Sequence, residues 1–417
     1  MSAAADDEIE RKNAKPRIST QEAEALIRIL VGIPSTTDVT LGQLDSYDDQ
    51  NFKVDIQSTP PVRYVLKIHN GVESLPGKIK LLHAQNSILL HLASGGGSVS
   101  FPRPLALPSL VDSKFVSHSQ ADEISAAYGD VHDDAFASSD KISPIGDGSL
   151  RIVRLPSCDG KQRFHAVRVL EYVEGELLAS KVDGGSEKYL ALLGKVGTTI
   201  ANMNKAIEEW KVHPGVVRSH LWDLASLSSL TGFLDHIADA DKRAIADRVY
   251  ADFAENVVPA MDSLPDAAIH NDANDQNILV DAEGNDVVGI IDFGDMVWTK
   301  RIFELAILTA YSILPSVALL DDPDHDDSAE LSRLLAAARA VISGYTSVFS
   351  TLSSLELSLL HTLIRARLAQ SVTMSAYSHS KDPTNDYLLV TARPGWNTLR
   401  LLETIDSTHF YDTVVAL

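Results

Sequence analysis

The sequence predicts an α+β protein with a small β-rich N-terminal part and a larger, mainly helical C-terminal part. Short β-forming runs separated by turns fill much of residues 37–172, whereas apolar residues recur at helical spacing over most of the chain after residue 175. The 417 residues are 45% hydrophobic and 22% charged, which is a globular composition, and the length suffices for two or three structural units. The composition and the two periodicities therefore predict the fold class without reference to any motif.

The charge of the chain argues against polyanionic partners. Thirty-six basic residues against 57 acidic ones give a formal net charge of -21, which would repel a nucleic-acid backbone or an anionic bilayer. No apolar run approaches the roughly 20 residues that span a bilayer. The N-terminal segment is acidic where a signal peptide would be basic. We therefore expect a cytoplasmic protein whose partners are small molecules, with no nucleic acid and no membrane.

The first 172 residues are expected to form a tail and a β-rich lobe. Residues 1–16 are small, charged and aperiodic, which predicts a disordered tail. The lobe should span residues 17–172, and its first helix should follow a capping box of Ser19 and Glu22 and end at Gly32. Its expected elements are a helix at about 20–31, β-runs at 37–44, 52–57 and 63–69, a helix at 78–92, an insertion at 112–148 and a hairpin of 150–155 with 163–172.

Residues 173–417 are expected to form the helical lobe. Leucine, isoleucine and valine recur at helical spacing through most of this part. The expected helices lie at about 190–210, 240–263, 301–313, 328–348, 354–378 and 386–405. Short β-runs interrupt them at 268–269, 278–280 and 287–291.

Those β-runs flank the strongest chemical motif of the chain. Asp272 is followed five positions later by Asn277, and the next β-run leads into Asp292-Phe293-Gly294. Phosphoryl transfer requires a carboxylate at the attacking hydroxyl together with a metal-binding amide and carboxylate. Asp272 would accept the substrate proton, and Asn277 and Asp292 would bind the metal. The alternative, a hairpin that uses these residues only in turns, does not account for the agreement between both halves of the motif.

A lysine upstream supplies a candidate phosphate ligand. Lys67 stands in the middle of the β-run Tyr64 to Ile68, where its apolar neighbours should face the core and its ammonium could reach phosphate oxygens. A lysine in a strand is ordinarily a solvated edge residue, but this one precedes the phosphoryl-transfer motif. We therefore assign it to the nucleotide. His270 is more plausibly a structural residue that supports the metal-binding segment than a catalyst.

Several segments together resemble the aminoglycoside-phosphotransferase family of small-molecule kinases, and most specifically its members that act on hydroxylysine. They cover the chain from about residue 15 to 404. The matching segments are 46–52, 64–68, 85–86, 269–279, 289–296, 303–304, 376–378 and 386–396.

The resemblance implies a bilobal protein-kinase-like fold and an Mg²⁺-dependent kinase. Its phosphoryl donor would be GTP (or ATP), its acceptor the hydroxyl of 5-hydroxy-L-lysine and its product 5-phosphonooxy-L-lysine. By the same resemblance, a turn containing Ser46, Gln50 and Asn51 would lie over the phosphates. The connector residues Glu171 and Val173 would meet the purine edge.

Two departures from the family pattern keep other functions open. No Asp or Glu occurs between Lys78 and Leu92, so Lys67 lacks the helix glutamate that kinases use as its partner. Asn271 stands where relatives usually have glycine. A nucleotide-binding pseudokinase is therefore a rival, and a choline-, ethanolamine- or homoserine-like acceptor is an alternative substrate.

An amino-acid acceptor would need a cation for its carboxylate and partners for its amines. Arg367 is the sequence candidate for that cation, and Asp386 or Trp396 could face an ammonium group. The alternative is that Arg367 is a surface arginine paired with a helix neighbour.

Overall fold

The computed structural model describes residues 10–46, 48–110, 113–128, 148–183, 185–317, 326–381 and 392–416. The chain divides into two compact units. The first comprises Met1–Ser94, Phe101–Val173 and His213–Gly215, and the second comprises Gly95–Ser100, Glu174–Val212 and Val216–Leu417. The main division falls after Val173, one residue beyond the end that the sequence indicated for the β-rich lobe.

The first unit is built on a five-stranded antiparallel sheet. Its strands are β1 (Val39–Leu44), β2 (Gln50–Ile56), β3 (Val62–Ile68), β4 (Arg151–Pro156) and β5 (Gln162–Glu171), in the spatial order β1-β2-β3-β5-β4. The register pairs Asn51 with Lys67 across β2 and β3, and Lys67 with Arg168 across β3 and β5. Because paired residues share a face of the sheet, these three side chains form one polar row.

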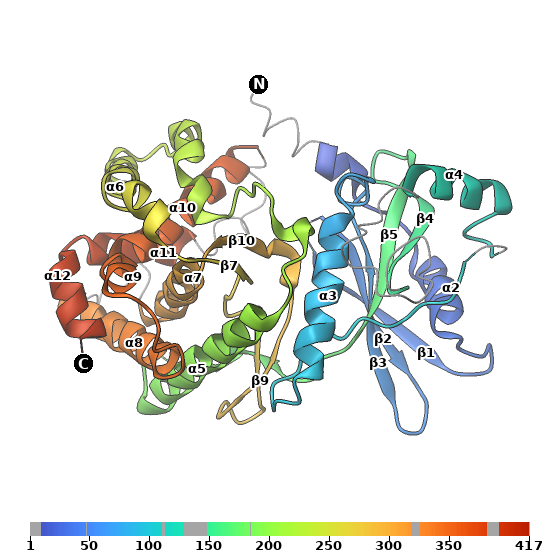
Figure 1. Cartoon of the computed structure of the whole chain (residues 1–417), viewed down its shortest axis with the longest axis horizontal. Helices are drawn as coiled ribbons and strands as arrows, with labels where there is room; N and C mark the ends of the chain where they lie inside the picture. Colours follow the sequence, from blue (N-terminus) through green and yellow to red (C-terminus); the bar gives the residue numbers. More distant parts are fainter. Residues whose placement is uncertain are drawn as a thin grey trace. The chain divides into compact units, whose positions relative to one another are not determined.

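Helices cover both faces of this sheet. Figure 1 shows α2 (Thr20–Val31) and α4 (His118–Tyr128) on one side and α3 (Lys80–Ser94) on the other. The core includes Leu26 of α2 with Phe52 and Leu66 of the sheet, all fully buried. The capping box at Ser19 is present, and α2 ends at Gly32 with a positive φ of 68°, as the sequence predicted.

The expected disordered tail is wrong for residues 10–16. Residues 10–14 are helical, Ala14 is buried, and Pro16 bridges to the sheet unit at Ser157. Arg11 donates to Asp48 over 2.7 Å and to Glu73 over 2.5 Å. Asp48 and Glu73 lie 37 and 62 residues further along the chain than Arg11. The sequence of residues 10–16 alone therefore does not indicate that the segment is ordered.

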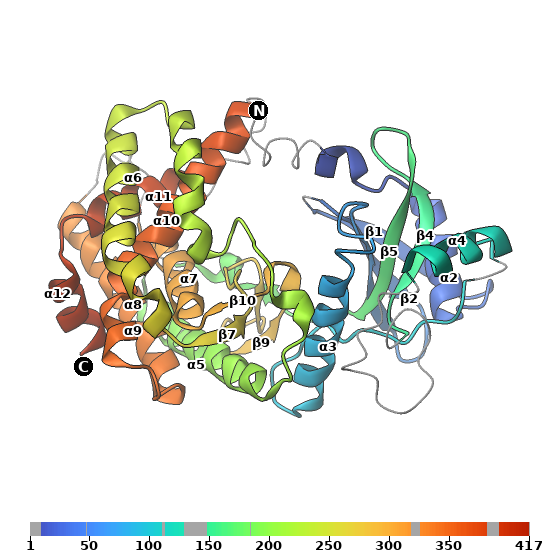
Figure 2. The ribbon, with the colours of Figure 1, turned by 45° about the horizontal axis from the view of Figure 1, so that its top comes forward.

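The second unit is mainly helical. Its helices are α5 (Glu187–Glu209), α6 (Ala240–Asp252), α7 (Ile302–Ile313), α8 (Asp327–Val348), α9 (Ser354–Ser358), α10 (Leu360–Lys381), α11 (Ala392–Leu402) and α12 (Ser407–Phe410). Figure 2 shows α10 running beside α6 and α11, and α10 also packs against α7. Two small sheets lie in the same unit. One is β6 (Glu176–Leu177), β8 (Ile278–Val280) and β9 (Val287–Ile290), and the other pairs β7 (Asp266–Ile269) with β10 (Val297–Lys300).

Helices α5 and α8 cross at backbone contact. A Cβ added at Gly197 would collide with the carbonyl oxygen of Val341, and one at Gly344 would collide with that of Gly194. Thr198 of α5 donates to the carbonyl of Gly344 over 3.2 Å. Glycine is needed here because any side chain would occupy the space of the opposing main chain.

Two helical predictions need correction, and one helix was not predicted. The helix expected at 240–263 is α-helical only to Asp252 and continues as a π turn and then a 3-10 turn, which has Pro259 near its start, where a missing N–H is tolerated. The helix expected at 354–378 is divided into α9 and α10. A 3-10 helix at Leu224–His236 was missed although its buried residues recur every third position, the period of that helix.

Among the helices that the structure describes, none combines the length and the apolar character required to cross a membrane.

Candidate active site

The phosphoryl-transfer motif lies in the second unit, on the loop 270–277 that joins β7 to β8. His270 is completely buried, and its Nδ1 accepts the Asp272 N–H over 3.2 Å while its Nε2 lies 3.0 Å from the Ile291 carbonyl. The accepting Nδ1 places the proton on Nε2, which donates to Ile291. Burial lowers the pKa of His270, so the ring is neutral. His270 therefore ties the loop to the strand that leads to Asp292.

Asn277 holds Asp272 in place. Its Nδ2 donates to the Asp272 carboxylate over 2.7 Å and to the Asp272 carbonyl over 2.9 Å, and Asn274 donates to the other carboxylate oxygen over 2.9 Å. The five-residue spacing read from the sequence thus brings the two side chains into contact. Because the amide nitrogen of Asn277 is engaged by Asp272, its amide oxygen is the atom that can ligate a metal.

Asp292 follows β9, directly after Ile291, whose backbone bonds to Asn277 and His270. It is exposed, has a φ of 59°, and accepts the Gly294 N–H over 3.3 Å. The Phe293 ring packs edge-on against His270 with 4.6 Å between ring centroids. The strained left-handed backbone at a non-glycine residue is typical of functional turns.

These residues fit a metal shared with a ligand. Asp292 and Asn277 offer one carboxylate and one amide oxygen, the hard donors that Mg²⁺ takes while the phosphates of a nucleotide supply the rest. Within the described ranges, no three His, Cys, Asp or Glu side chains gather into a protein-only metal cage. Burial, reinforced by Asp295 and Asp292, raises the pKa of Asp272 well above its ordinary value, and Arg367 opposes the rise. A cation would relieve this concentration of negative charge.

The backbone of the loop is clamped by two buried charged residues. Glu304 of α7 accepts the N–H of His270 over 2.5 Å and that of Asn271 over 3.4 Å. Arg367 of α10 donates to the Asn271 carbonyl over 3.2 Å. Asn271 has a φ of 68°, so the asparagine at the family's usual glycine position adopts the left-handed conformation that it tolerates better than most residues.

Glu304 had no role assigned from the sequence, although a signal was present. It is the one charged residue in the sequence of α7, and it is completely buried. Burial raises its pKa from 4.5 to about 7, and the two backbone hydrogen bonds oppose that rise. A carboxylate kept at such a position in an apolar helix indicates a specific task.

The expected role of Arg367 as an open cation for a substrate is not supported. Its side chain is 1% exposed, and its guanidinium donates to the Trp222 carbonyl over 2.6 Å and to Gln370 over 3.0 Å. A group bonded in this way has no surface left for a ligand carboxylate. Trp396, on α11, is 8% exposed, so its ring is mostly covered. Asp386 lies outside the described residues.

In the first unit, Lys67 is half-buried on β3 between the fully buried Leu66 and Ile68, as expected. The turn before β2 carries Asp49, whose carboxylate lies 3.1 Å from His69 Nδ1 and accepts the Asn70 N–H over 2.9 Å. Burial alone would raise the pKa of Asp49, but His69 and Lys67 hold it below its usual range. Asp49 is thus a part-buried anion whose charge is stabilised by His69 and Lys67, an electrostatic role similar to that of the absent helix glutamate.

Helix α3 contacts an arginine of the same polar row. Arg168 is 2% exposed and donates to Gln85 over 2.7 Å and to Asn86 over 2.9 Å. The side-chain oxygen of Gln85 therefore accepts from Arg168. Sequence reasoning missed this arginine because nothing local distinguishes it from other residues of β5.

The turn residues expected to bind nucleotide are used largely within the unit. The Gln50 amide exchanges two 2.9 Å hydrogen bonds with the Ile18 backbone, which removes it from the side chains that could hold a ligand. Ser46 accepts the Asp49 N–H through its hydroxyl over 3.2 Å. Asn51 is 8% exposed and faces Lys67 in the row. These contacts engage Ser46 and Gln50 within the unit.

The connector residues are also placed by the structure. Glu171 ends β5, and its N–H donates to the Arg103 carbonyl over 2.8 Å, so that donor is already used. Val173 is mostly buried at the end of the first unit. Their assignment to the purine stays a prediction.

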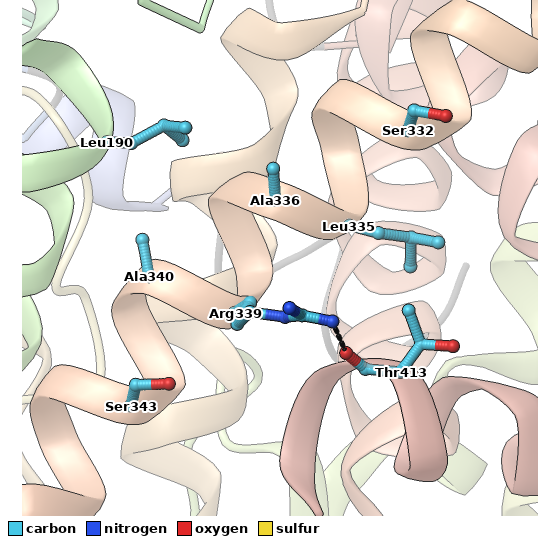
Figure 3. Close-up of a pocket in the computed structure, with 8 residues that line it drawn as sticks. All are labelled: Leu190, Ser332, Leu335, Ala336, Arg339, Ala340, Ser343 and Thr413. Carbon is cyan, nitrogen blue, oxygen red and sulfur yellow. Dashed lines mark hydrogen bonds between the residues drawn. The ribbon is translucent and has the colours of Figure 1, made fainter. Parts of the chain in front are cut away.

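A separate surface pocket of about 570 Å³ lies where α5, α8 and the C-terminal π turn meet (Figure 3). Its lining is apolar or small apart from Arg339, which donates to the Thr413 carbonyl. The residues that line it are Leu190, Ser332, Leu335, Ala336, Arg339, Ala340, Ser343 and Thr413. None of them belongs to the phosphoryl-transfer motif.

Comparison with known proteins gives a consistent result. The sequence profile of the phosphotransferase enzyme family matches residues 149–340. Hydroxylysine kinase of Xenopus laevis is 30% identical over 406 residues, covering 94% of this chain and 91% of that protein. Hydroxylysine kinase of Mus musculus is 27% identical over 407 residues, covering 94% and 90%.

Solved structures confirm the fold class that the sequence predicted. An amicoumacin kinase in complex with AMP-PNP and Ca²⁺ has a TM-score of 0.57 at 12% identity, covering 98% of this chain and 97% of that one. A putative aminoglycoside phosphotransferase from Ralstonia eutropha has a TM-score of 0.53 at 11% identity, covering 94% and 100%. At such identities the likeness concerns the fold, which is kinase-like and α+β.

Proposed function

The chain belongs to the hydroxylysine kinase family, and from this premise we propose that it transfers the γ-phosphoryl group of GTP to the hydroxyl of 5-hydroxy-L-lysine. The product would be 5-phosphonooxy-L-lysine. The broader activity, phosphotransfer to an alcohol group by a small-molecule kinase, follows from the family itself.

The observation that carries the proposal is the contact of Asn277 with Asp272. The amides of Asn277 and Asn274 orient the Asp272 carboxylate. The amide oxygen of Asn277 and the carboxylate of Asp292 can then ligate a metal. In the reaction, the acceptor oxygen forms a bond to the γ-phosphorus as the bond to the β–γ bridging oxygen breaks. The hydroxyl proton goes to Asp272, whose raised pKa suits a proton acceptor.

Asn277 and Asp292 would hold Mg²⁺, which when bound neutralises charge on the phosphate oxygens. The amicoumacin kinase complex with AMP-PNP and Ca²⁺ is in keeping with nucleotide and divalent-cation use on this fold. Lys67 would contact the phosphates in the first unit, with Asp49 as its fixed counter-charge. ATP is the alternative donor, because backbone contacts at the connector do not distinguish the purines by residue identity.

Retention of Asp272, Asn277 and Asp292 supports turnover over the pseudokinase alternative. A module that only bound nucleotide would have no use for a held proton acceptor. Asn271 was one of the two departures that motivated the pseudokinase alternative. It adopts the left-handed backbone conformation that glycine takes readily, so it keeps the form of the loop.

The test is product identification by the purified protein. We expect phosphorylated 5-hydroxy-L-lysine with GTP and Mg²⁺, detected by ³¹P NMR and mass spectrometry. L-lysine, which lacks the hydroxyl, is the matched negative substrate. ATP, choline, ethanolamine and homoserine complete the panel. Preferred phosphorylation of another acceptor would replace the substrate, and nucleotide binding without transfer to any acceptor would establish the pseudokinase.

A further inference from the structure

Arg367 is the largest of the fully buried side chains in the described part of the chain. Burying a guanidinium is costly unless its N–H groups and charge find partners. Its partners come from two other segments of the second unit, because it donates to the Trp222 carbonyl and the Asn271 carbonyl. Such a group stabilises the arrangement of the segments that it joins.

The orientation of the guanidinium is fixed by aromatic rings. The Trp222 ring lies 5.2 Å and the Tyr311 ring 5.4 Å from its central carbon, both within the range of cation–π contacts. Gln370, one turn further along α10, accepts from the same nitrogen that donates to Trp222. The fork of N–H groups therefore has a defined direction toward the loop.

The catalytic loop needs such a hold. Asn271 is a non-glycine residue in the left-handed region, a backbone conformation that is unfavourable for a residue with a side chain. Its N–H donates to Glu304 and its carbonyl accepts from Arg367, so both sides of the residue are held by buried side chains. The same arginine nitrogen lies 3.7 Å from Oδ1 of Asp272.

We propose that Arg367 is a positioning residue for phosphoryl transfer, which fixes the Asn271–Asp272 segment so that the Asp272 carboxylate points at the acceptor hydroxyl. It acts through Asp272 and does not touch the substrate. The inference rests on the proposed function, in which Asp272 receives the hydroxyl proton.

The experiment compares Arg367→Ala and Arg367→Lys with Arg365→Ala. Arg365 is a matched control because it lies on the same helix and its guanidinium pairs with Asp252 and Glu403 instead of the loop. Steady-state rates with 5-hydroxy-L-lysine, and with the corresponding hydroxy-diamine that lacks the carboxylate, are measured together with hydrogen exchange of the peptide covering residues 270–277. Peptides from α8 serve as an internal reference for global stability.

For Arg367→Ala we expect kcat to fall roughly 10²-fold, since a small misplacement of a reacting group is that costly, while KM for nucleotide changes by less than about twofold. Exchange should accelerate in residues 270–277 and not in α8. Millimolar guanidinium should restore part of kcat. Arg367→Lys should lose roughly tenfold, because an ammonium cannot reproduce the fork. Arg365→Ala should keep wild-type turnover.

Four outcomes would overturn the proposal. One is wild-type kcat with unchanged exchange in Arg367→Ala, or in Arg367→Lys should the alanine variant fail to fold. The second is a loss confined to acceptors that carry a carboxylate, which would return Arg367 to substrate binding. The third is an equal acceleration of hydrogen exchange in α8, which would show that Arg367 stabilises the whole unit and does not act on the loop in particular. The last is an equal loss of turnover in Arg365→Ala. If the wild-type protein phosphorylates no hydroxylysine, the proposed function fails, while exchange over 270–277 and nucleotide hydrolysis still decide the role of Arg367.

Discussion

Replacing Glu304 by glutamine should change how stability depends on pH. Burial raises the pKa of Glu304 from 4.5 in the unfolded chain to about 7 in the folded one. Below pH 4.5 both states are protonated and the contribution of this group to folding is fully present. As pH rises, the unfolded state loses its proton first, so the contribution is lost by the time pH passes 7.

The size of the effect follows from the shift. A difference of about 2.5 units at ~1.36 kcal/mol each is about 3 kcal/mol in total. Roughly 2.5 kcal/mol of this falls between pH 5 and pH 8. Glutamine keeps an oxygen for the backbone N–H groups but does not titrate. The free energy of unfolding of the glutamine variant, relative to that of the wild type, should therefore rise by that amount between pH 5 and pH 8. At roughly 2–4 °C per kcal/mol, the gain is about 5–10 °C in Tm.

The assay is thermal unfolding of both proteins at pH 5, 6, 7 and 8. Glu356→Gln is the matched control, because Glu356 is also fully buried, but although burial raises its pKa, its contacts with Arg301 and Ser353 together lower the pKa below the ordinary value. Its contribution is lost only as pH falls below about 4.5, so the Tm difference should be constant across this range. A constant difference for Glu304→Gln as well would refute the argument that Glu304 holds a proton near neutral pH.

Three further substitutions test the site. Asp272→Asn should lower kcat by a factor on the order of 10² to 10⁴ with little change in nucleotide affinity. Wild-type turnover in this variant would show that Asp272 is not the proton acceptor. Asp292→Ala should abolish Mg²⁺-dependent nucleotide binding and turnover together. An unchanged Mg²⁺ dependence in titrations would show that other residues bind the metal. Asp49→Asn should raise KM for nucleotide roughly tenfold by freeing Lys67 from its fixed counter-charge; an unaltered KM would show that Lys67 is positioned by other contacts.

The motif Asp272 to Asp292 could be predicted from the sequence because its function depends on local spacing. A loop of fixed length between two strands brings the Asn277 amide into contact with the Asp272 carboxylate. The antiparallel sheet and most helices follow likewise from local periodicity and turn residues.

The supporting residues could not be predicted because their partners are remote in sequence. Arg367 lies 96 residues from the carbonyl that it holds, and Arg168 lies 83 residues from Gln85. Arg367 was misread for the same reason. A buried cation and a cation awaiting a ligand look identical in a sequence, and only the contacts of the folded chain separate them.

The crossing of α5 and α8 has a consequence for how this sequence can diverge. At Gly197 and Gly344 each added side chain would occupy the backbone of the facing helix, so a single substitution on either helix has no compensating change on the other short of moving the helices apart. A single replacement at either glycine is therefore not accommodated while the two helices keep their present spacing. Divergence there requires a jump in which helix spacing and several core residues change together.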